Sequence, residues 1–185
     1  MIDNALIFLK KQLNNYIRLK TNSPENKVVF LDNSNIEQVV FPDDAITLLL
    51  INLEEERIFK SGAVYNGGSQ LQANPNLSIN LYTLFVSKFT NYSDSLKFLS
   101  LTVSFFNSYR VLESKKFPSL SSEIEKLTME VVNIPLENQG DMWSLLNTFY
   151  RPSILYKVRM IVFKDEESTD ISSEIIDSQT VTRKI

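Results

Sequence analysis

Two long strand-like runs in the first half of the chain constrain the fold more than any other feature. The run AITLLLINLEEERIF covers residues 45–59, and the run LSINLYTLFVSKF covers residues 77–89. The first run begins almost wholly apolar, which suits a strand covered on both faces, and then alternates between apolar and polar residues, as the second run does. Residues 60–76 between them contain three of the four glycines, at 62, 67 and 68. This arrangement predicts one long hairpin, and a hairpin requires antiparallel pairing.

The remaining elements follow from hydrophobic periodicity and from breaks at Pro, Asn and Ser. Helical spacing of apolar residues predicts helices, and short apolar or alternating runs predict strands. The predicted helices cover residues 2–19, 92–112 and 137–149, and the predicted strands, besides the hairpin, cover residues 28–33, 36–41, 126–134 and 153–163. Asp3 is the predicted cap of the first helix, and Ser93 or Asp94 that of the second. The order predicts an α+β fold, with a mixed, largely antiparallel sheet and helices packed on one face.

The chain divides into one domain and a tail. Residues 1–163 have the length and apolar content of a single α+β domain. Residues 164–185 are polar and acidic without a sustained period, so we expect a C-terminal tail or arm that orders only against a neighbour.

Composition removes several classes of function. The 185 residues include no cysteine and no histidine, which excludes disulfides, thiolate zinc sites and every histidine-dependent catalytic dyad or triad. A net charge of -3 without a basic block argues against a nucleic-acid or anionic-membrane surface. The longest apolar stretch, residues 45–53, is far shorter than the roughly 20 residues of a membrane helix. We expect a cytoplasmic protein without a cofactor, a metal or a small-molecule substrate.

The acidic run Glu54-Glu55-Glu56, followed by Arg57, is the first candidate site. Glu54 and Glu56 share a strand face, because side chains alternate along a strand. Two carboxylates on one face are the pattern of acid/base work, and they suggest a small carboxylate-dependent hydrolase as an alternative function. No phosphate-binding glycine loop accompanies them. Another kind of binding module is the other alternative. The ordinary interpretation is an exposed strand end, with Arg57 as a local partner, or a strand end that faces a neighbouring subunit.

The segment Trp143–Met160 supplies the other candidates. Lys157 and Arg159 lie two residues apart, and therefore on one face of the last predicted strand. Trp143, the only tryptophan, is either a core residue or an interface anchor. Tyr150 and Arg151 precede a proline, which favours a tight corner between helix and strand. These residues, like the acidic run, are candidates for an interface with a neighbouring subunit or another protein.

Four segments of the chain together resemble the cap or tube-terminator family of extracellular contractile injection systems, the phage-tail-like particles made by bacteria. The segments are MIDNALIFLKKQLNNYI at residues 1–17, ITLLLINLEEERIFK at 46–60, LSINLYTLFVSKFTNYSDSLKFLSLTVSFF at 77–106 and WSLLNTFYRPSILYKVRM at 143–160. The resemblance runs from the start of the chain to about residue 162. Arg151 departs from the leucine-like residue expected in that family.

This resemblance implies a structural part rather than an enzyme. Members of the family are similar to phage tail terminators, so the resemblance implies a homo-hexameric ring on the end of an inner tube. Its partners would be the tube and sheath proteins of the particle and a paralogous cap protein. In such a ring, Lys157 and Arg159 are expected to pair with the acids Glu54–Glu56, either within one chain or across the contact between subunits.

Overall fold

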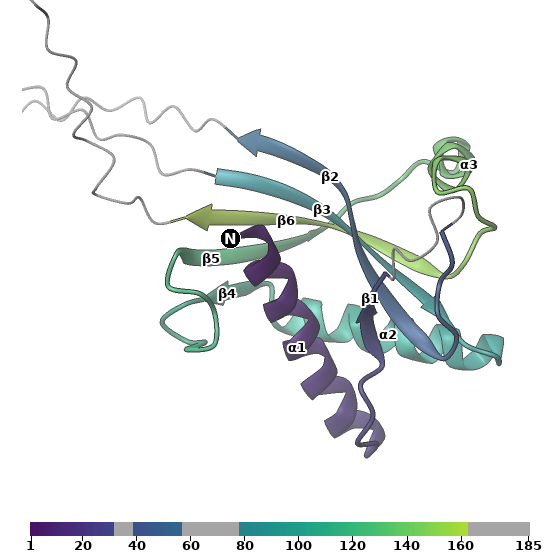
Figure 1. The fold of residues 1–185 in the computed structure, drawn as a ribbon, viewed down its shortest axis with the longest axis horizontal. Helices are drawn as coiled ribbons and strands as arrows, with labels where there is room; N and C mark the ends of the chain where they lie inside the picture. Colours follow the sequence, from purple (N-terminus) through teal and green to yellow (C-terminus); the bar gives the residue numbers. More distant parts are fainter. Residues whose placement is uncertain (32–38, 57–77, 163–185) are drawn as a thin grey trace, which may run out of the picture.

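The computed structural model describes residues 1–31, 39–56 and 78–162, and within them the chain forms three helices and six strands (Figure 1). The helices are α1 (Ile2–Thr21), α2 (Tyr92–Ser108) and α3 (Leu136–Leu145). The strands are β1 (Val28–Phe30), β2 (Ala45–Glu56), β3 (Ser78–Lys88), β4 (Val111–Glu113), β5 (Ile124–Val131) and β6 (Ser153–Val162). The predicted α+β class is confirmed.

All six strands belong to one sheet in the order β1-β2-β3-β6-β5-β4. Only β1 is parallel to its neighbour, and every other pair is antiparallel. The predicted hairpin is confirmed, since β2 and β3 pair from Ala45 opposite Lys88 to Glu56 opposite Ser78. The last strand, β6, inserts between β3 and β5, so the C-terminal end of the described chain lies in the middle of the sheet.

A bulge in β2 decides on which face of the sheet the side chains of the acidic run lie. The register of β2 against β3 shifts between Leu50 and Asn52, so one extra residue reverses the alternation. Beyond the bulge, Glu54 and Glu56 lie opposite Asn80 and Ser78 on one face of the sheet. The prediction that these two carboxylates share a face is therefore confirmed.

The main core lies between the sheet and the two long helices. The apolar stripes of α1 and α2 pack on alternate residues of β3, β5 and β6, and the fully buried members include Leu9, Leu13, Phe106, Leu81, Phe85, Leu127 and Met160. Asn14 of α1 is buried, and its amide donates to the Val28 carbonyl and accepts from the Val28 amide, each at 2.9 Å. This pair of bonds attaches the edge strand β1 to α1. Burial of each large apolar side chain stabilises the fold by about 1.5–3 kcal/mol.

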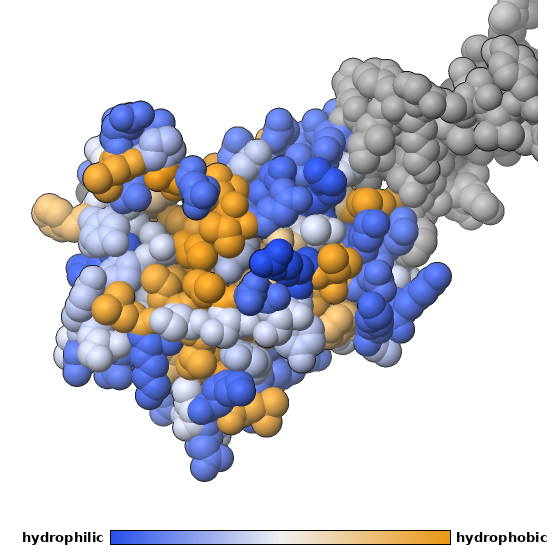
Figure 2. Space-filling view, turned by 180° about the vertical axis from the view of Figure 1, so that it is seen from behind, coloured by the Kyte–Doolittle hydropathy of each residue, from blue (hydrophilic) through white to orange (hydrophobic). Residues whose placement is uncertain are grey.

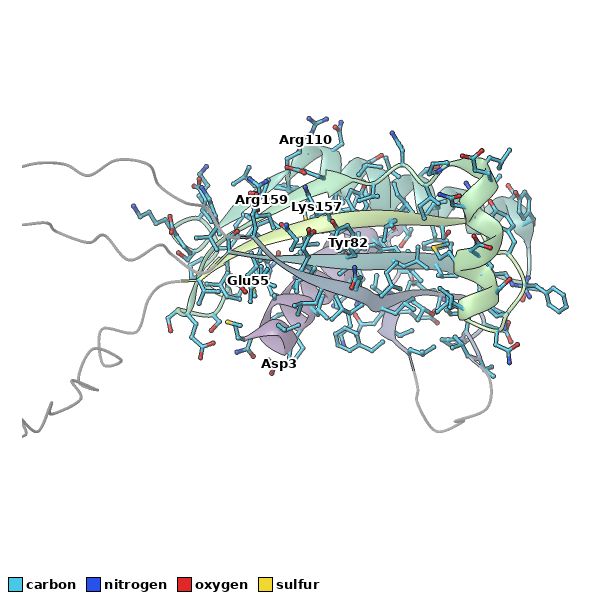
Figure 3. The ribbon with its side chains drawn as sticks, turned by 90° about the horizontal axis from the view of Figure 1, so that it is seen from above. Asp3, Glu55, Tyr82, Arg110, Lys157 and Arg159 are labelled. Carbon is cyan, nitrogen blue, oxygen red and sulfur yellow. The ribbon has the colours of Figure 1, made fainter. Side chains whose placement is uncertain are left out.

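The short helix α3 covers part of the opposite face of the sheet (Figure 3). Trp143 packs there with Phe41, Leu84, Val86 and Leu155 in a second, smaller core. Leu84 and Val86 point away from their neighbour Phe85, which belongs to the main core, so the two cores lie on opposite faces of β3. The helices α1 and α2 share one face as expected, whereas α3 lies on the other. Coverage on both sides explains why β3 is buried along most of its length.

Several predicted boundaries were wrong. The second helix ends at Ser108, and residues 111–113 form β4, because Leu112 is fully buried against β5. The cap of α2 is Asn91, whose side chain accepts from the Ser93 amide, rather than Ser93 or Asp94. Asp3 lies inside the first turn of α1, where the terminal amine donates to it, and is not its cap.

Some predictions fall partly or wholly outside the described residues. Residues 39–41, the part of the predicted strand 36–41 that the structure describes, are not in a strand. The tail at 164–185 lies outside the described ranges, so the domain division stays a prediction.

Candidate interaction surface

The half of the α3-side face that α3 leaves open carries most of the predicted charged residues (Figure 3). Two rows of side chains run across the strands of this half. The first row contains Glu54, Asn80, Arg159 and Thr128, and the second contains Asn52, Tyr82, Lys157 and Glu130. Strand pairing therefore brings residues from β2, β3, β6 and β5 into one polar surface.

Arg159 forms an ion pair with Glu56 that spans the intervening strand β3. Its Nε lies 2.8 Å from Glu56 Oε2, and its Nη2 donates to Glu56 Oε1 at 3.1 Å. Ser78 on β3 donates to the same carboxylate at 3.5 Å. The two charged side chains are 33% and 30% exposed, so solvent screens them and the pair contributes about 0–1 kcal/mol. Pairing within one chain and pairing between subunits were both expected for Arg159, and the structure shows pairing within one chain.

Lys157 and Glu54 have other partners. The Lys157 ammonium lies 3.0 Å from Glu130 of the neighbouring strand β5, so the expected pairing of Lys157 with the acidic run is wrong within the chain. The Tyr82 hydroxyl donates to Glu54 at 2.8 Å, and this bond to a carboxylate raises the pKa of Tyr82. Glu130 lies directly opposite Lys157 in the register of β5 and β6. This alignment favours an ion pair with Glu130 over one with the acidic run.

The middle residue of the acidic run, Glu55, lies opposite Ile79, whose side chain belongs to the main core, and therefore faces the helix side of the sheet. It does not join Glu54 and Glu56. Arg57 lies outside the described residues.

Trp143 is a core residue and not an exposed anchor. It is 6% exposed, with its ring 6.3 Å from Phe41 and 5.7 Å from Tyr150, both in edge-on geometry. Tyr150 is more than half exposed and covers the outer side of the indole. The carbonyl of the buried Pro152 accepts from the Ser87 amide at 2.9 Å, which fixes the start of β6 against β3. Tyr150-Arg151-Pro152 therefore forms the corner that the sequence predicted.

The sequence patterns did not indicate two highly exposed apolar side chains in and after α3. Leu145 at the end of α3 and Phe149 in the turn that follows are 87% and 84% exposed. The exposure of Leu145 could have been predicted, because Leu145 lies roughly opposite the buried Trp143 on a helix with 3.6 residues per turn. An apolar residue on the outer side of a helix that already has a buried stripe indicates an additional contact surface.

The described part of the chain offers no evident place for a metal or a membrane span. No group of three or more Asp or Glu side chains there could hold a metal ion. None of the described helices is long and apolar enough to cross a membrane. Glu54 accepts a hydrogen bond from Tyr82 of β3, and Glu56 forms an ion pair with Arg159 of β6.

The six-stranded sheet with two long helices on one face and a short helix on the other defines the class of this protein as an α+β domain with a polar sheet surface. Among solved structures, the chain is similar to the tube-terminating cap of the anti-feeding prophage, with a TM-score of 0.51 at 14% identity, over 97% of this chain and 61% of that one. It is also similar to the PVC sheath/tube terminator in its extended state, with a TM-score of 0.45 at 14% identity, over 94% of this chain and 62% of that one. The chain thus spans less than two thirds of the length of either structure, and the match to the tube-terminating cap shows a shared fold.

Residues 7–175 match the Pvc16 N-terminal domain family, and the chain belongs to this family. The match extends past the predicted domain boundary at residue 163. No curated protein matches the chain.

Proposed function

We propose that this protein is a structural cap that terminates the inner tube, the sheath, or both, of an extracellular contractile injection particle. The observation that carries the proposal is membership of the Pvc16 N-terminal domain family over residues 7–175. The fold shared with the tube-terminating cap of the anti-feeding prophage supports it. In this role the chain binds tube and sheath proteins, is made in the cytoplasm and is incorporated into the particle there.

The cap acts as a ring of identical copies, with six as the expected number. A tube end is circular, and a ring of one chain closes through a head-to-tail contact repeated by rotation. A paralogous cap protein is a further expected partner. The polar sheet surface is one region available for the contacts with tube or sheath.

The alternative of a carboxylate-dependent hydrolase finds no support in the geometry. Catalysis by Glu54 and Glu56 requires at least one of them to be poised to exchange a proton. Glu54 instead accepts from the Tyr82 hydroxyl, and Glu56 is held between Arg159 and Ser78. The chain shares its fold with a tube-terminating cap, and we propose no enzymatic activity.

Electron micrographs of particles from a strain lacking this chain test the proposal. We expect tubes of uncontrolled length, or particles without a stable sheath, and we expect a plasmid copy of the gene to restore normal particles. Particles of normal length and normal sheath in the deletion strain would refute a terminating role.

A further inference from the structure

The first surface that the proposed function does not yet use is the tip of α3, which we define as Asp141, Leu145 and Phe149. Asp141 and Leu145 are four residues apart, so they share one face of α3. Leu145 and Phe149 are almost fully exposed. Among the described residues, Asp141 has no cationic partner. Single exposed apolar residues are ordinary, but an exposed Leu145 one helical turn from the unpaired Asp141, with the exposed Phe149 four residues further along the chain, favours a contact. Figure 2 shows apolar residues gathering on the half of the molecule away from the grey segments.

A second surface lies at the other side of the sheet, in a groove between α2 and β5. Its pocket of about 420 Å³ is lined by Val103 and Asn107 of α2, by Arg110, and by Met129 and Val131 of β5. Val103 and Val131 are 37% and 53% exposed. We call this pocket the α2–β5 groove.

The charges of this groove are complementary to those of the α3 tip. The Arg110 guanidinium is exposed and donates to the amide oxygen of Asn107 at 2.8 Å, and no carboxylate of the described chain pairs with it. Glu130 also lines the groove, but it already pairs with Lys157 at 3.0 Å. The groove therefore combines apolar side chains with the unpaired positive charge of Arg110. The tip combines exposed apolar side chains with the unpaired negative charge of Asp141.

We propose that the α3 tip of one copy docks into the α2–β5 groove of the next copy, with Phe149 against Val103 and Val131, and Asp141 facing Arg110. A ring contact joins two different surfaces of the same chain, so each copy must carry both complementary halves. Two tips placed against each other would bring like charges together. This inference rests on the proposed ring and specifies the contact that closes it.

Cysteine cross-linking tests the contact directly, because the chain contains no cysteine. The double variant Phe149→Cys/Val131→Cys should give, under mild oxidation of assembled caps, a ladder of covalent oligomers that ends at the ring number. Phe149→Cys alone and Val131→Cys alone should give no ladder. Leu19→Cys/Val131→Cys is the matched control, because Leu19 on α1 is also 84% exposed but belongs to neither surface.

Each outcome decides for or against the contact. Absence of the ladder in a double variant that still caps tubes would overturn the contact and leave the proposed function intact. Covalent dimers from Phe149→Cys alone would also overturn it, since they indicate tip-to-tip contact. If the double variant fails to cap tubes while the Leu19 control caps them, only Phe149 is implicated, because both variants carry Val131→Cys, and the charge-reversal variants below then decide for or against the contact. A ladder together with normal particles in the strain that lacks this chain would support the contact and refute the function.

Charge reversal gives an independent readout. Asp141→Arg and Arg110→Glu should each reduce the fraction of chain in rings at least tenfold, and the two together should recover most of it. Lys116→Glu is the control for altered net charge, because Lys116 is exposed outside both surfaces and is expected to leave assembly unchanged. Equal loss in the single and double variants, with circular dichroism unchanged, would contradict the pairing of Asp141 with Arg110.

Discussion

At the residue scale, the ion pair between Arg159 and Glu56 connects β6 to β2 over the intervening strand β3. Both side chains are about one third exposed, so we expect a coupling energy of no more than about 1 kcal/mol. A double-mutant cycle with Arg159→Ala and Glu56→Ala, measured by urea unfolding, checks this value. The exposed pair Lys116–Glu113 is the control, with a coupling near zero. A coupling above about 2 kcal/mol for Arg159 and Glu56 would show that the pair is far less screened than its exposure indicates.

Tyr156 gives the protein a stability that depends on alkaline pH. It is 2% exposed and packs on Phe85 and Phe106, and this burial raises its pKa from 10.0 to about 12. Below pH 10 the phenol is neutral in both the folded and unfolded states, so its contribution is fully present. Between pH 10 and 12 only the unfolded state releases the proton, so stability falls with rising pH, by on the order of 1–3 kcal/mol.

The matched variant for this prediction is Tyr156→Phe, which keeps the ring and removes the ionisable group. Denaturant unfolding at intervals from pH 8 to 12 should show a shallower decline in the variant than in the parent chain. The remaining decline includes Tyr82, whose pKa is also raised by its bond to Glu54. Identical pH profiles for the two proteins would contradict a buried, neutral Tyr156.

At the scale of elements, the attachment of α3 to the sheet depends mainly on one buried side chain. Trp143 is the only buried residue of α3 and packs on Phe41, Leu84, Val86 and Leu155. We expect Trp143→Ala to reduce the free energy of unfolding by about 3–5 kcal/mol, as is usual for a buried tryptophan. Leu145→Ala on the same helix is the control, with a change within about 0.5 kcal/mol, because Leu145 is exposed. Far-UV circular dichroism in urea measures both, and similar losses for the two variants would contradict the second core.

Sequence periodicity predicted the elements that have strong apolar patterns. The hairpin of β2 and β3, the helix α1 and the strand β6 follow directly from alternating or helical spacing. The strand β4 was missed because Val111-Leu112 continues the apolar run of the preceding helix, and only tertiary contact with β5 makes it a strand. Short elements have too few residues for their period to be read, so packing determines them.

The sequence predicted which charged residues of the candidate site share a strand face, but not which of them form ion pairs. Alternation placed Glu54 with Glu56, and Lys157 with Arg159, on common faces. Which cation meets which acid depends on strand order and register, and the insertion of β6 between β3 and β5 cannot be read from spacing. That insertion places Glu130 beside Lys157, and Asn80 between Glu54 and Arg159. Phe149 was predicted as the last residue of the third helix, but α3 ends at Leu145, so helical spacing could not predict the exposure of Phe149.

At the scale of the whole molecule, the charges that close a ring should be those that have no partner within one chain. Arg159 and Lys157 are already paired with Glu56 and Glu130 inside the chain. Arg159→Gln and Lys157→Gln therefore remove partly exposed pairs worth about 0–1 kcal/mol each, and we expect the fraction of chain in rings to stay near that of the parent protein. Loss of a charge that pairs across the contact between subunits is expected to have a larger effect on ring formation.

A partly desolvated charge at the contact behaves differently, because its loss leaves the partner unpaired at roughly 2–5 kcal/mol per contact. In a closed ring the same lesion occurs at every contact, so even the lower value removes most of the assembly. Negative-stain counts of capped tubes, with sedimentation of the free chain, compare Arg159→Gln with Phe149→Ser at equal concentration. We expect rings with the first variant and few with the second, while both remain folded. Loss of rings with Arg159→Gln alone, in a folded protein, would show that Arg159 also reaches the neighbouring copy and that its pair with Glu56 opens on assembly.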